Sequence, residues 1–190
     1  MNTTEEIIKR LKTGNEQFVK DKLTQDNLDR STRKSLVKGQ DPFAIILSCA
    51  DSRVIPELIF DTGLGELFVV RVAGNIANTS TIASIEYSVA HLNTQLVVVL
   101  GHQNCGAVTA AVKGGDNGYN LNHLLAHILP ALEATSDDAS VDEVIRKNAK
   151  LTVKELAKRS DIIASAVESG KLKIIPAYYN LETGVVDFLG

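Results

Sequence analysis

Short apolar runs alternate with segments of helical spacing along most of this chain. Residues 43–48, 67–72 and 96–100 are continuous apolar runs of strand length, which is typical of strands buried on both faces. A fourth run begins at 172–175 and continues after a proline. Helical spacing fills much of the sequence between and after them, at residues 81–91, 107–112, 121–133 and 143–169. This alternation predicts an α/β fold with a mostly parallel central sheet and flanking helices.

The two ends of the chain depart from this alternation. Residues 4–20 have one broad apolar face, which predicts an amphipathic helix, and the stretch that follows is polar. We therefore expect one domain over residues 1–190, with an N-terminal helical arm at 1–40 and an α/β core at 41–190. Near the C-terminus, a Glu-Thr-Gly turn at 182–184 lies between apolar runs and predicts a hairpin, so the sheet is expected to have an antiparallel edge.

Composition narrows the classes of function. The 190 residues carry a net charge of −3 with acids and bases intermixed, so no basic groove for nucleic acid is expected. The apolar runs are far shorter than the roughly 20 residues of a membrane span, so no membrane partner is expected. The acidic start lacks the apolar stretch of a signal peptide, which favours a cytoplasmic location. In a reducing cytosol the two cysteines are ligands, nucleophiles or buried thiols rather than a disulfide.

Both cysteines follow the carboxyl end of a predicted strand, and each has another ligand type nearby. Cys49 and Asp51 follow the first strand, and His102 and Cys105 follow the third. Ligands bind outside the carboxyl ends of strands in open parallel sheets. Thiolate, imidazole and carboxylate together are the ligands of zinc, whereas calcium and magnesium prefer oxygen alone. Either cysteine by itself could be ordinary packing, and the pair lacks the C-x-x-C spacing of a redox dithiol.

Because one of the four candidate ligands is a carboxylate, the ligands favour a catalytic zinc site over a closed structural one. Asp51 is the ligand that exchanges most easily, and Arg53 lies two residues beyond it. If Asp51 left the metal to pair with Arg53, the fourth position would open to water, which zinc would convert to hydroxide near neutral pH. Two thiolates already cancel the zinc charge, so we expect a less acidic water than on three neutral histidines and an activity that rises toward alkaline pH.

These motifs resemble the signature of the β-class carbonic anhydrases. The signature elements are C-x-D-x-R at 49–53 and H-x-x-C-G at 102–106, and the likeness is strongest over 40–112. The resemblance implies one zinc ion per chain, held permanently by the two cysteines and the histidine. It makes Asp51 the exchangeable fourth ligand or the acceptor that orients hydroxide, with Arg53 holding it off the metal. The implied activity is the reversible hydration of carbon dioxide to bicarbonate and a proton, by attack of zinc-bound hydroxide.

The same resemblance implies a set of substrate-binding residues. Gln40 would hydrogen-bond the substrate, and Phe68 and Tyr87 would line a narrow apolar pocket, often across a dimer interface. Ala73 matches a position that is often valine, which would widen the pocket, and Gly106 would place a backbone N–H near the bound anion. From the residues alone, Gln40 could equally be a solvated turn residue, and Phe68 and Tyr87 could be plain core.

The resemblance also implies a homo-oligomer and a subtype. Family members form dimers or tetramers in which the N-terminal helix packs on a partner subunit. Members that are closed by bicarbonate have Trp and Gly where this chain has Ile46 and Ser48, so it resembles the constitutively open subtype. Arg71, inside an apolar run, suggests a buried ion pair.

Two other functions stay open at this level. A hydrolase of carbonyl sulfide or carbon disulfide could use the same zinc chemistry, although the Asp-Ser-Arg tripeptide at 51–53 disfavours it. A non-catalytic zinc module would hold the metal with no exchangeable position, and it would tolerate loss of Asp51.

Overall fold

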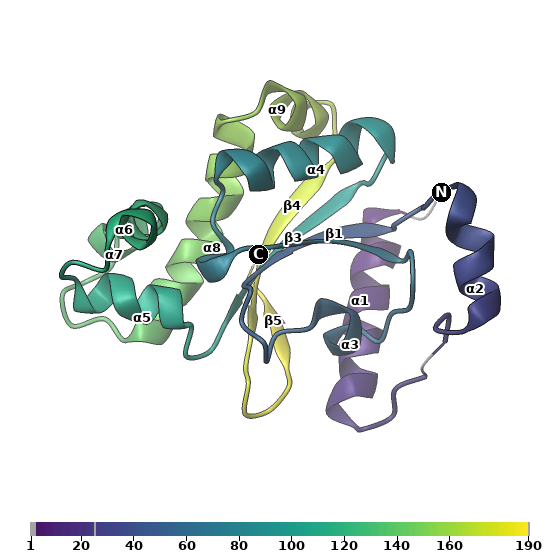
Figure 1. Ribbon diagram of the computed structural model, residues 1–190, viewed down its shortest axis with the longest axis horizontal. Helices are drawn as coiled ribbons and strands as arrows, with labels where there is room; N and C mark the ends of the chain where they lie inside the picture. Colours follow the sequence, from purple (N-terminus) through teal and green to yellow (C-terminus); the bar gives the residue numbers. More distant parts are fainter. Residues whose placement is uncertain (1–2, 25, 190) are drawn as a thin grey trace.

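A five-stranded sheet forms the centre of the molecule (Figure 1). The computed structural model describes residues 3–24 and 26–189, so four residues of the expected domain, including the start of its arm, lie outside the described part. The strand order is β2-β1-β3-β4-β5, with the first four strands parallel and β4–β5 antiparallel. The strands are β1 (Ala44–Ser48), β2 (Leu67–Arg71), β3 (Leu96–His102), β4 (Lys173–Tyr179) and β5 (Val186–Phe188). The predicted α/β fold with an antiparallel C-terminal edge is confirmed.

The register of the central strands brings their carboxyl ends to one edge of the sheet. Ser48, the last residue of β1, pairs with Arg71 of β2 and with Leu100 of β3. The segments that leave β1 and β3 therefore start side by side, although they lie far apart in the sequence. Because β1 and β3 are buried along their whole length, their apolar runs show no alternation.

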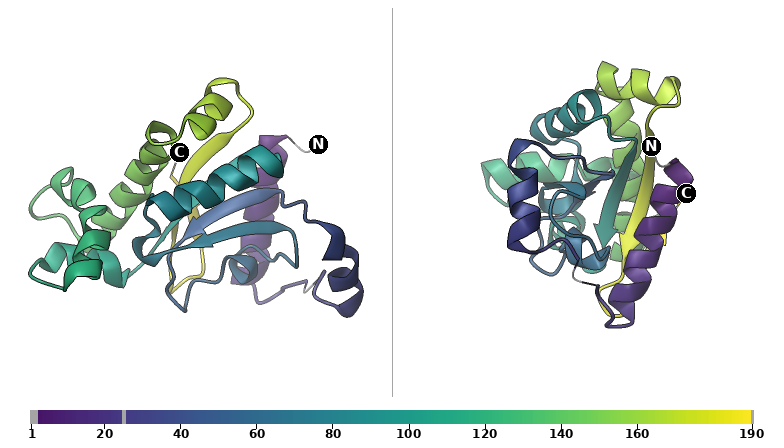
Figure 2. Two further views of the ribbon diagram at one scale, coloured as in Figure 1. Left: turned by 45° about the horizontal axis from the view of Figure 1, so that its top comes forward. Right: turned by 90° about the vertical axis from the view of Figure 1, so that its right-hand side faces the viewer.

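Helices cover both faces of this sheet (Figures 1 and 2). One face packs side chains such as Ile45 and Val99 against α4, α8 and α9, and the other packs residues such as Ile46 and Val98 against α1 and α3. A third cluster, under α5 to α7, lies beyond the carboxyl edge. The bounds are α1 (Thr4–Val19), α2 (Arg30–Ser35), η1 (Leu36–Lys38), α3 (Pro56–Ile59), η2 (Ala73–Asn75), α4 (Thr79–His91), α5 (Gly106–Lys113), α6 (Tyr119–Ala126), α7 (Leu129–Glu133), α8 (Val141–Lys158) and α9 (Asp161–Glu168).

The first helix packs on the sheet of its own chain. A capping box of Thr3 and Glu6 starts α1, and Leu11 is fully buried in the same cluster as residues of β1 and β3. Asn15 then ties the helix to the C-terminal hairpin, since its side chain donates to Gly184 O (2.8 Å) and accepts from Val186 N (2.9 Å). The later part of the expected arm differs from α1, since α2 lies at the side of the molecule (Figure 1) and the segment around it contacts the loop that precedes β2.

Prolines and caps explain where the helices differ from the prediction. The segment 121–133, predicted as one helix, is two helices, because Pro130 stands in the first turn of α7 and has no N–H to continue a helix through it. Ser160 caps α9 and separates it from α8. Within the described residues, no helix is both long and apolar enough to cross a membrane.

Candidate metal centre

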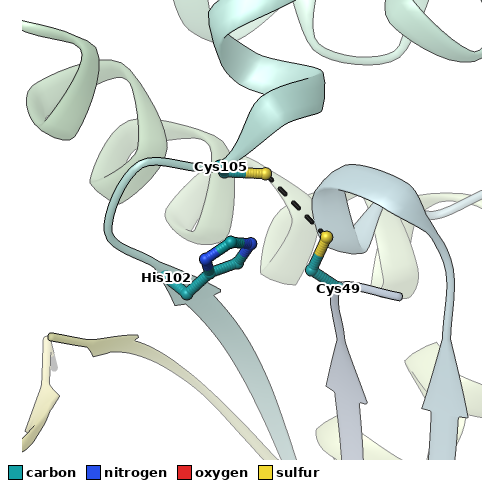
Figure 3. Close-up of side chains that lie close together, drawn as sticks. All are labelled: Cys49, His102 and Cys105. Atoms are coloured by element: carbon teal, nitrogen blue, oxygen red, sulfur yellow. Dashed lines mark hydrogen bonds between the residues drawn. The ribbon is translucent and has the colours of Figure 1, made fainter. Parts of the chain in front are cut away.

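Three buried side chains converge at the carboxyl edge of the sheet (Figure 3). Cys49 directly follows β1, His102 is the last residue of β3, and Cys105 precedes the first turn of α5. One potential ligand atom from each residue lies within 4.8 Å of the other two. The sheet register accounts for this meeting, since adjacent parallel strands end at the same level. Tyr179 on β4 pairs with His102 and lies beside it at the same edge of the sheet.

The geometry of the cluster fits a zinc ion. The two Sγ atoms are 3.9 Å apart, and two sulfurs on one tetrahedral zinc at ~2.3 Å would be roughly 3.8 Å apart. Nδ1 of His102 lies 2.9 Å from Gln103 O and must donate to it, since a carbonyl oxygen only accepts. This tautomer leaves a lone pair on Nε2, which is fully buried and has no hydrogen-bond partner among the residues that the structure describes. The cluster fits one zinc ion per chain.

The charge state of the thiols also suits a cation. The hydrogen bond from Cys105 lowers the pKa of Cys49 far below that of an ordinary thiol, and the N–H of Gly74 acts in the same direction. The same bond, together with burial, raises the pKa of Cys105 above its ordinary range. Two thiols this close share one proton, because two adjacent thiolates would repel each other. A divalent cation would supply that charge and release the proton.

Asp51 stands at the margin of this cluster and pairs with Arg53. Arg53 donates from Nε to Oδ1 (2.9 Å), from Nη2 to Oδ2 (2.8 Å) and from its backbone N to Oδ1 (3.0 Å). These bonds hold the pKa of Asp51 well below its usual range, so the carboxylate is ionised at neutral pH. Its Oδ2 lies 3.9 Å from Nε2 of His102. The carboxylate therefore faces the three ligands without being one of the clustered atoms.

Arg71 orients the loop between Cys49 and Asp51, a role that the sequence did not suggest. It donates from Nε to Cys49 O (3.2 Å) and from Nη2 to Asp51 O (2.8 Å). The predicted buried ion pair is wrong, since Arg71 is exposed and its partners are carbonyl oxygens. As the last residue of an edge strand, it points past the sheet instead of into it. The position of Arg71 beside this loop follows from the register of β2 with β1, which the sequence does not show.

The residues that the sequence assigned to the substrate fall into two groups. Ala73 and Gly106 adjoin the cluster, because Gly74 N donates to Cys49 Sγ and Gly106 follows Cys105. Gln40, Phe68 and Tyr87 lie elsewhere. Gln40 precedes β1 and Cys49 follows it, so the strand separates them by on the order of 17 Å.

Phe68 and Tyr87 form a pair between the edge strand β2 and helix α4. Phe68 lies next to Ile45, near the start of β1, so it is displaced from the carboxyl edge. The two rings have centroids 6.3 Å apart, and Tyr87 is 50% exposed. Neither residue is plain buried core, and neither reaches the metal cluster of its own chain.

Comparisons with known proteins agree with this site. The sequence profile of the family described as carbonic anhydrase matches residues 44–186. Carbonic anhydrase 2 of Mycobacterium tuberculosis is 39% identical over 182 residues, covering 93% of this chain and 88% of that protein. A carbonic anhydrase of Mycolicibacterium smegmatis is 36% identical over 185 residues, covering 94% and 90%.

Solved structures show the same likeness. A structure from Sordaria macrospora, described as one of two tetrameric β-carbonic anhydrases, has a TM-score of 0.76 at 25% identity and covers 97% of this chain and 98% of that one. The β-carbonic anhydrase of Coccomyxa, solved with acetazolamide, has a TM-score of 0.75 at 25% identity, covering 100% and 87%. The chain belongs to the carbonic anhydrase family, and within it to the β class.

Proposed function

We propose that the chain catalyses the reversible hydration of carbon dioxide to bicarbonate at the Cys49–His102–Cys105 centre. The observation that carries this proposal is the buried Cys–His–Cys cluster with an ionised carboxylate facing it, in a chain of the carbonic anhydrase family. A zinc ion on these ligands supplies a Lewis acid that makes water a nucleophile at neutral to alkaline pH. Residues of the chain orient this water and bind the substrate.

Asp51 acts as the acceptor that orients the attacking water. Its pKa is held low by Arg53, so the carboxylate accepts a hydrogen bond and does not donate one. Arg53 binds both carboxylate oxygens, which fixes the plane of the group as well as its position. A water fixed by Asp51 keeps its remaining lone pair free for the carbon of the substrate.

The same pairing supports the constitutively open subtype. Both oxygens of Asp51 bind Arg53, so the carboxylate would have to loosen these hydrogen bonds before it could become the fourth ligand of the metal. Ile46 and Ser48, both fully buried in β1, occupy the places where the closed subtype has Trp and Gly. On this proposal the resting enzyme keeps Asp51 on Arg53 and leaves the fourth position for water.

A second copy of the chain completes the substrate pocket. Gln40, Phe68 and Tyr87 lie too far from the cluster of their own chain to touch a substrate bound there. Phe68 lies on the edge strand β2, Tyr87 lies on α4 beside it, and Gln40 precedes β1, the neighbour of β2 in the sheet. Pairing of two chains across this surface would bring these residues of each protomer to the metal centre of the other.

The rest of the proposal concerns assembly and organisation. One domain spans 1–190, its arm at 1–40 contacts the partner through α2 and η1, and Val37 on η1 is 81% exposed. The Sordaria macrospora relatives are described as tetrameric, which supports a dimer or tetramer here. Ligand thiols must stay reduced, which supports a cytoplasmic location.

Stopped-flow turnover on two substrates tests the proposal. Purified protein is assayed with carbon dioxide and with carbonyl sulfide, and its metal content is measured on the same sample. The proposal expects about one zinc per chain and fast turnover of carbon dioxide. Turnover of carbonyl sulfide alone would make the chain a hydrolase on the same scaffold. Tight zinc with neither activity would indicate a structural site.

A further inference from the structure

A buried asparagine on α8 reaches the loop that contacts the metal cluster. Asn148 is 2% exposed, and its Nδ2 donates to Gly74 O at 2.9 Å. The two residues are far apart in the sequence, and the bond crosses from α8 to η2. A buried amide is costly unless it is hydrogen-bonded, so this contact fixes where η2 lies relative to α8.

The residue that Asn148 holds is also a partner of a metal ligand. Gly74 N donates to Cys49 Sγ at 3.4 Å, so two consecutive hydrogen bonds join the asparagine to the thiolate. No ligand of the cluster lies on α8. Asn148 therefore acts on the centre only through the backbone of Gly74.

The backbone at Gly74 needs such a restraint. Gly74 has φ +71°, and the next residue, Asn75, has φ +45°, so two successive residues lie in the left-handed region. A Cβ on Gly74 would come within 2.8 Å of Ile128 Cδ1 and would be strained at this positive φ, so the position favours glycine, which has no side chain to hold the loop. Without its bond to Asn148, the glycine could rotate and turn its N–H away from sulfur.

Helix α8 also contacts the segment that carries His102. Gly101, which precedes His102, is packed so closely against α8 that a Cβ on it would lie 3.1 Å from Ile145 Cγ2 and 3.7 Å from Ala149 Cβ. Ile145 and Ala149 lie one turn apart on α8, and Asn148 stands between them in the sequence. The helix thus sets the relative position of the segments that carry Cys49 and His102.

We propose that Asn148 is a positioning residue for the metal centre, which holds the Gly74 N–H on the Cys49 thiolate. An N–H donor takes up part of the charge of a thiolate, so it tunes both the strength of the metal–sulfur bond and the electron density left on the metal. The inference rests on the proposed function only in requiring that the centre binds a metal.

Replacing the asparagine tests this role. Asn148→Leu has a similar size and no donor, and Thr152→Val is its matched control, because Thr152 is a buried polar residue one turn further along α8. We expect the zinc dissociation constant, measured by chelator competition, to rise about tenfold in Asn148→Leu. The thiolate-to-cobalt absorption of the cobalt-substituted protein should shift in Asn148→Leu and stay unchanged in Thr152→Val. Circular dichroism and thermal unfolding establish that each variant is folded.

Two further measurements keep the inference open to refutation. Asn148→Asp keeps the size but turns an acceptor toward the Gly74 carbonyl, and it should change zinc affinity and spectrum in the same direction. In wild-type protein loaded with cadmium-113, the Gly74 amide proton should show a scalar coupling to the metal through sulfur. A wild-type zinc affinity and cobalt spectrum in Asn148→Leu, or no coupling at Gly74, would overturn the inference. Wild-type protein that binds zinc without hydrating carbon dioxide would refute the proposed function and leave this test intact.

Discussion

Arg53 holds both carboxylate oxygens of Asp51, with hydrogen bonds of 2.9 Å from Nε and 2.8 Å from Nη2. The pair combines an ionised acceptor with a fixed orientation, and it does so at the edge of a buried cluster of metal-ligand atoms. A single hydrogen bond would leave the carboxylate free to rotate. The function of Arg53 is therefore expected to depend on its planar fork and not on its charge alone.

Arg53→Lys tests this dependence. Lysine keeps the positive charge but lacks the planar fork that gives two parallel hydrogen bonds, so Asp51 loses its fixed plane. We expect kcat for carbon dioxide hydration to fall on the order of 100-fold, with the zinc content unchanged. Stopped-flow assays on samples of known metal content provide the measurement. A lysine variant with the wild-type kcat would show that charge alone is sufficient.

Mixing two inactive variants tests whether the pocket is completed by a partner. Gln40→Ala removes a group from the partner's site, and Asp51→Ala removes one from the site of its own chain. In a mixed dimer, one of the two sites keeps both groups intact, so random reassociation should restore about a quarter of wild-type activity. Activity after co-refolding, compared with each variant refolded alone, gives the result. No recovery in verified mixed dimers would place Gln40 outside the partner's site.

The close approach of α1 to the core predicts a sharp difference between two glycines. A Cβ on Gly14 would lie 1.9 Å from Phe60 O, whereas a Cβ on Gly39 would meet nothing within 4 Å. Gly14→Ala should therefore destabilise the protein by about 1–3 kcal/mol or more, and Gly39→Ala should change stability by less than about 0.5 kcal/mol. Urea unfolding of both variants measures the difference. Equal stabilities would contradict the close packing of α1 against the end of α3 in its own chain.

His127 predicts a pH dependence of stability at mildly acidic pH. Burial, and then the nearby guanidinium of Arg159, lower its pKa below the ordinary 6.5. The unfolded chain therefore binds a proton at this histidine at a higher pH than the folded chain does. The stability that neutral His127 contributes is complete above about pH 6.5, and it is lost as the pH falls through the lower pKa of the folded state. His127→Gln should unfold with a shallower loss of stability between about pH 7.5 and 5.5.

His123→Gln serves as the control for that experiment. The two imidazoles meet edge to face with ring centroids 5.8 Å apart, but His123 is exposed. Its replacement should leave most of the pH slope in place. A slope that is unchanged in His127→Gln and reduced in His123→Gln would contradict the assignment.

The metal ligands could be predicted from the sequence because their placement depends on strand ends. Two apolar runs of strand length, each followed by a cysteine, are enough to place Cys49 and Cys105 at one edge of a parallel sheet. The sheet and its antiparallel edge follow from the same alternation of patterns. The exchange of Asp51 between the metal and Arg53 was also inferred from the ligand chemistry, and the family resemblance added the alternative that Asp51 orients hydroxide.

The surroundings of the metal could not be predicted, because they depend on backbone contacts between distant segments. Arg71 binds two carbonyl oxygens, and Asn148 binds a third, and no side-chain pattern marks such partners. The apolar face of α1 predicts burial but does not say which chain supplies the surface. Its packing became clear only from contacts such as Asn15 with Gly184.

Hydration of carbon dioxide by the zinc-loaded protein and by Asp51→Ala, at equal zinc content, tests the central claim most directly. The account predicts rapid turnover by the wild type that rises toward alkaline pH, and a loss of at least about 100-fold in the variant, because the attacking water loses its acceptor. An Asp51→Ala protein that holds the same zinc and turns over at the wild-type rate would contradict it.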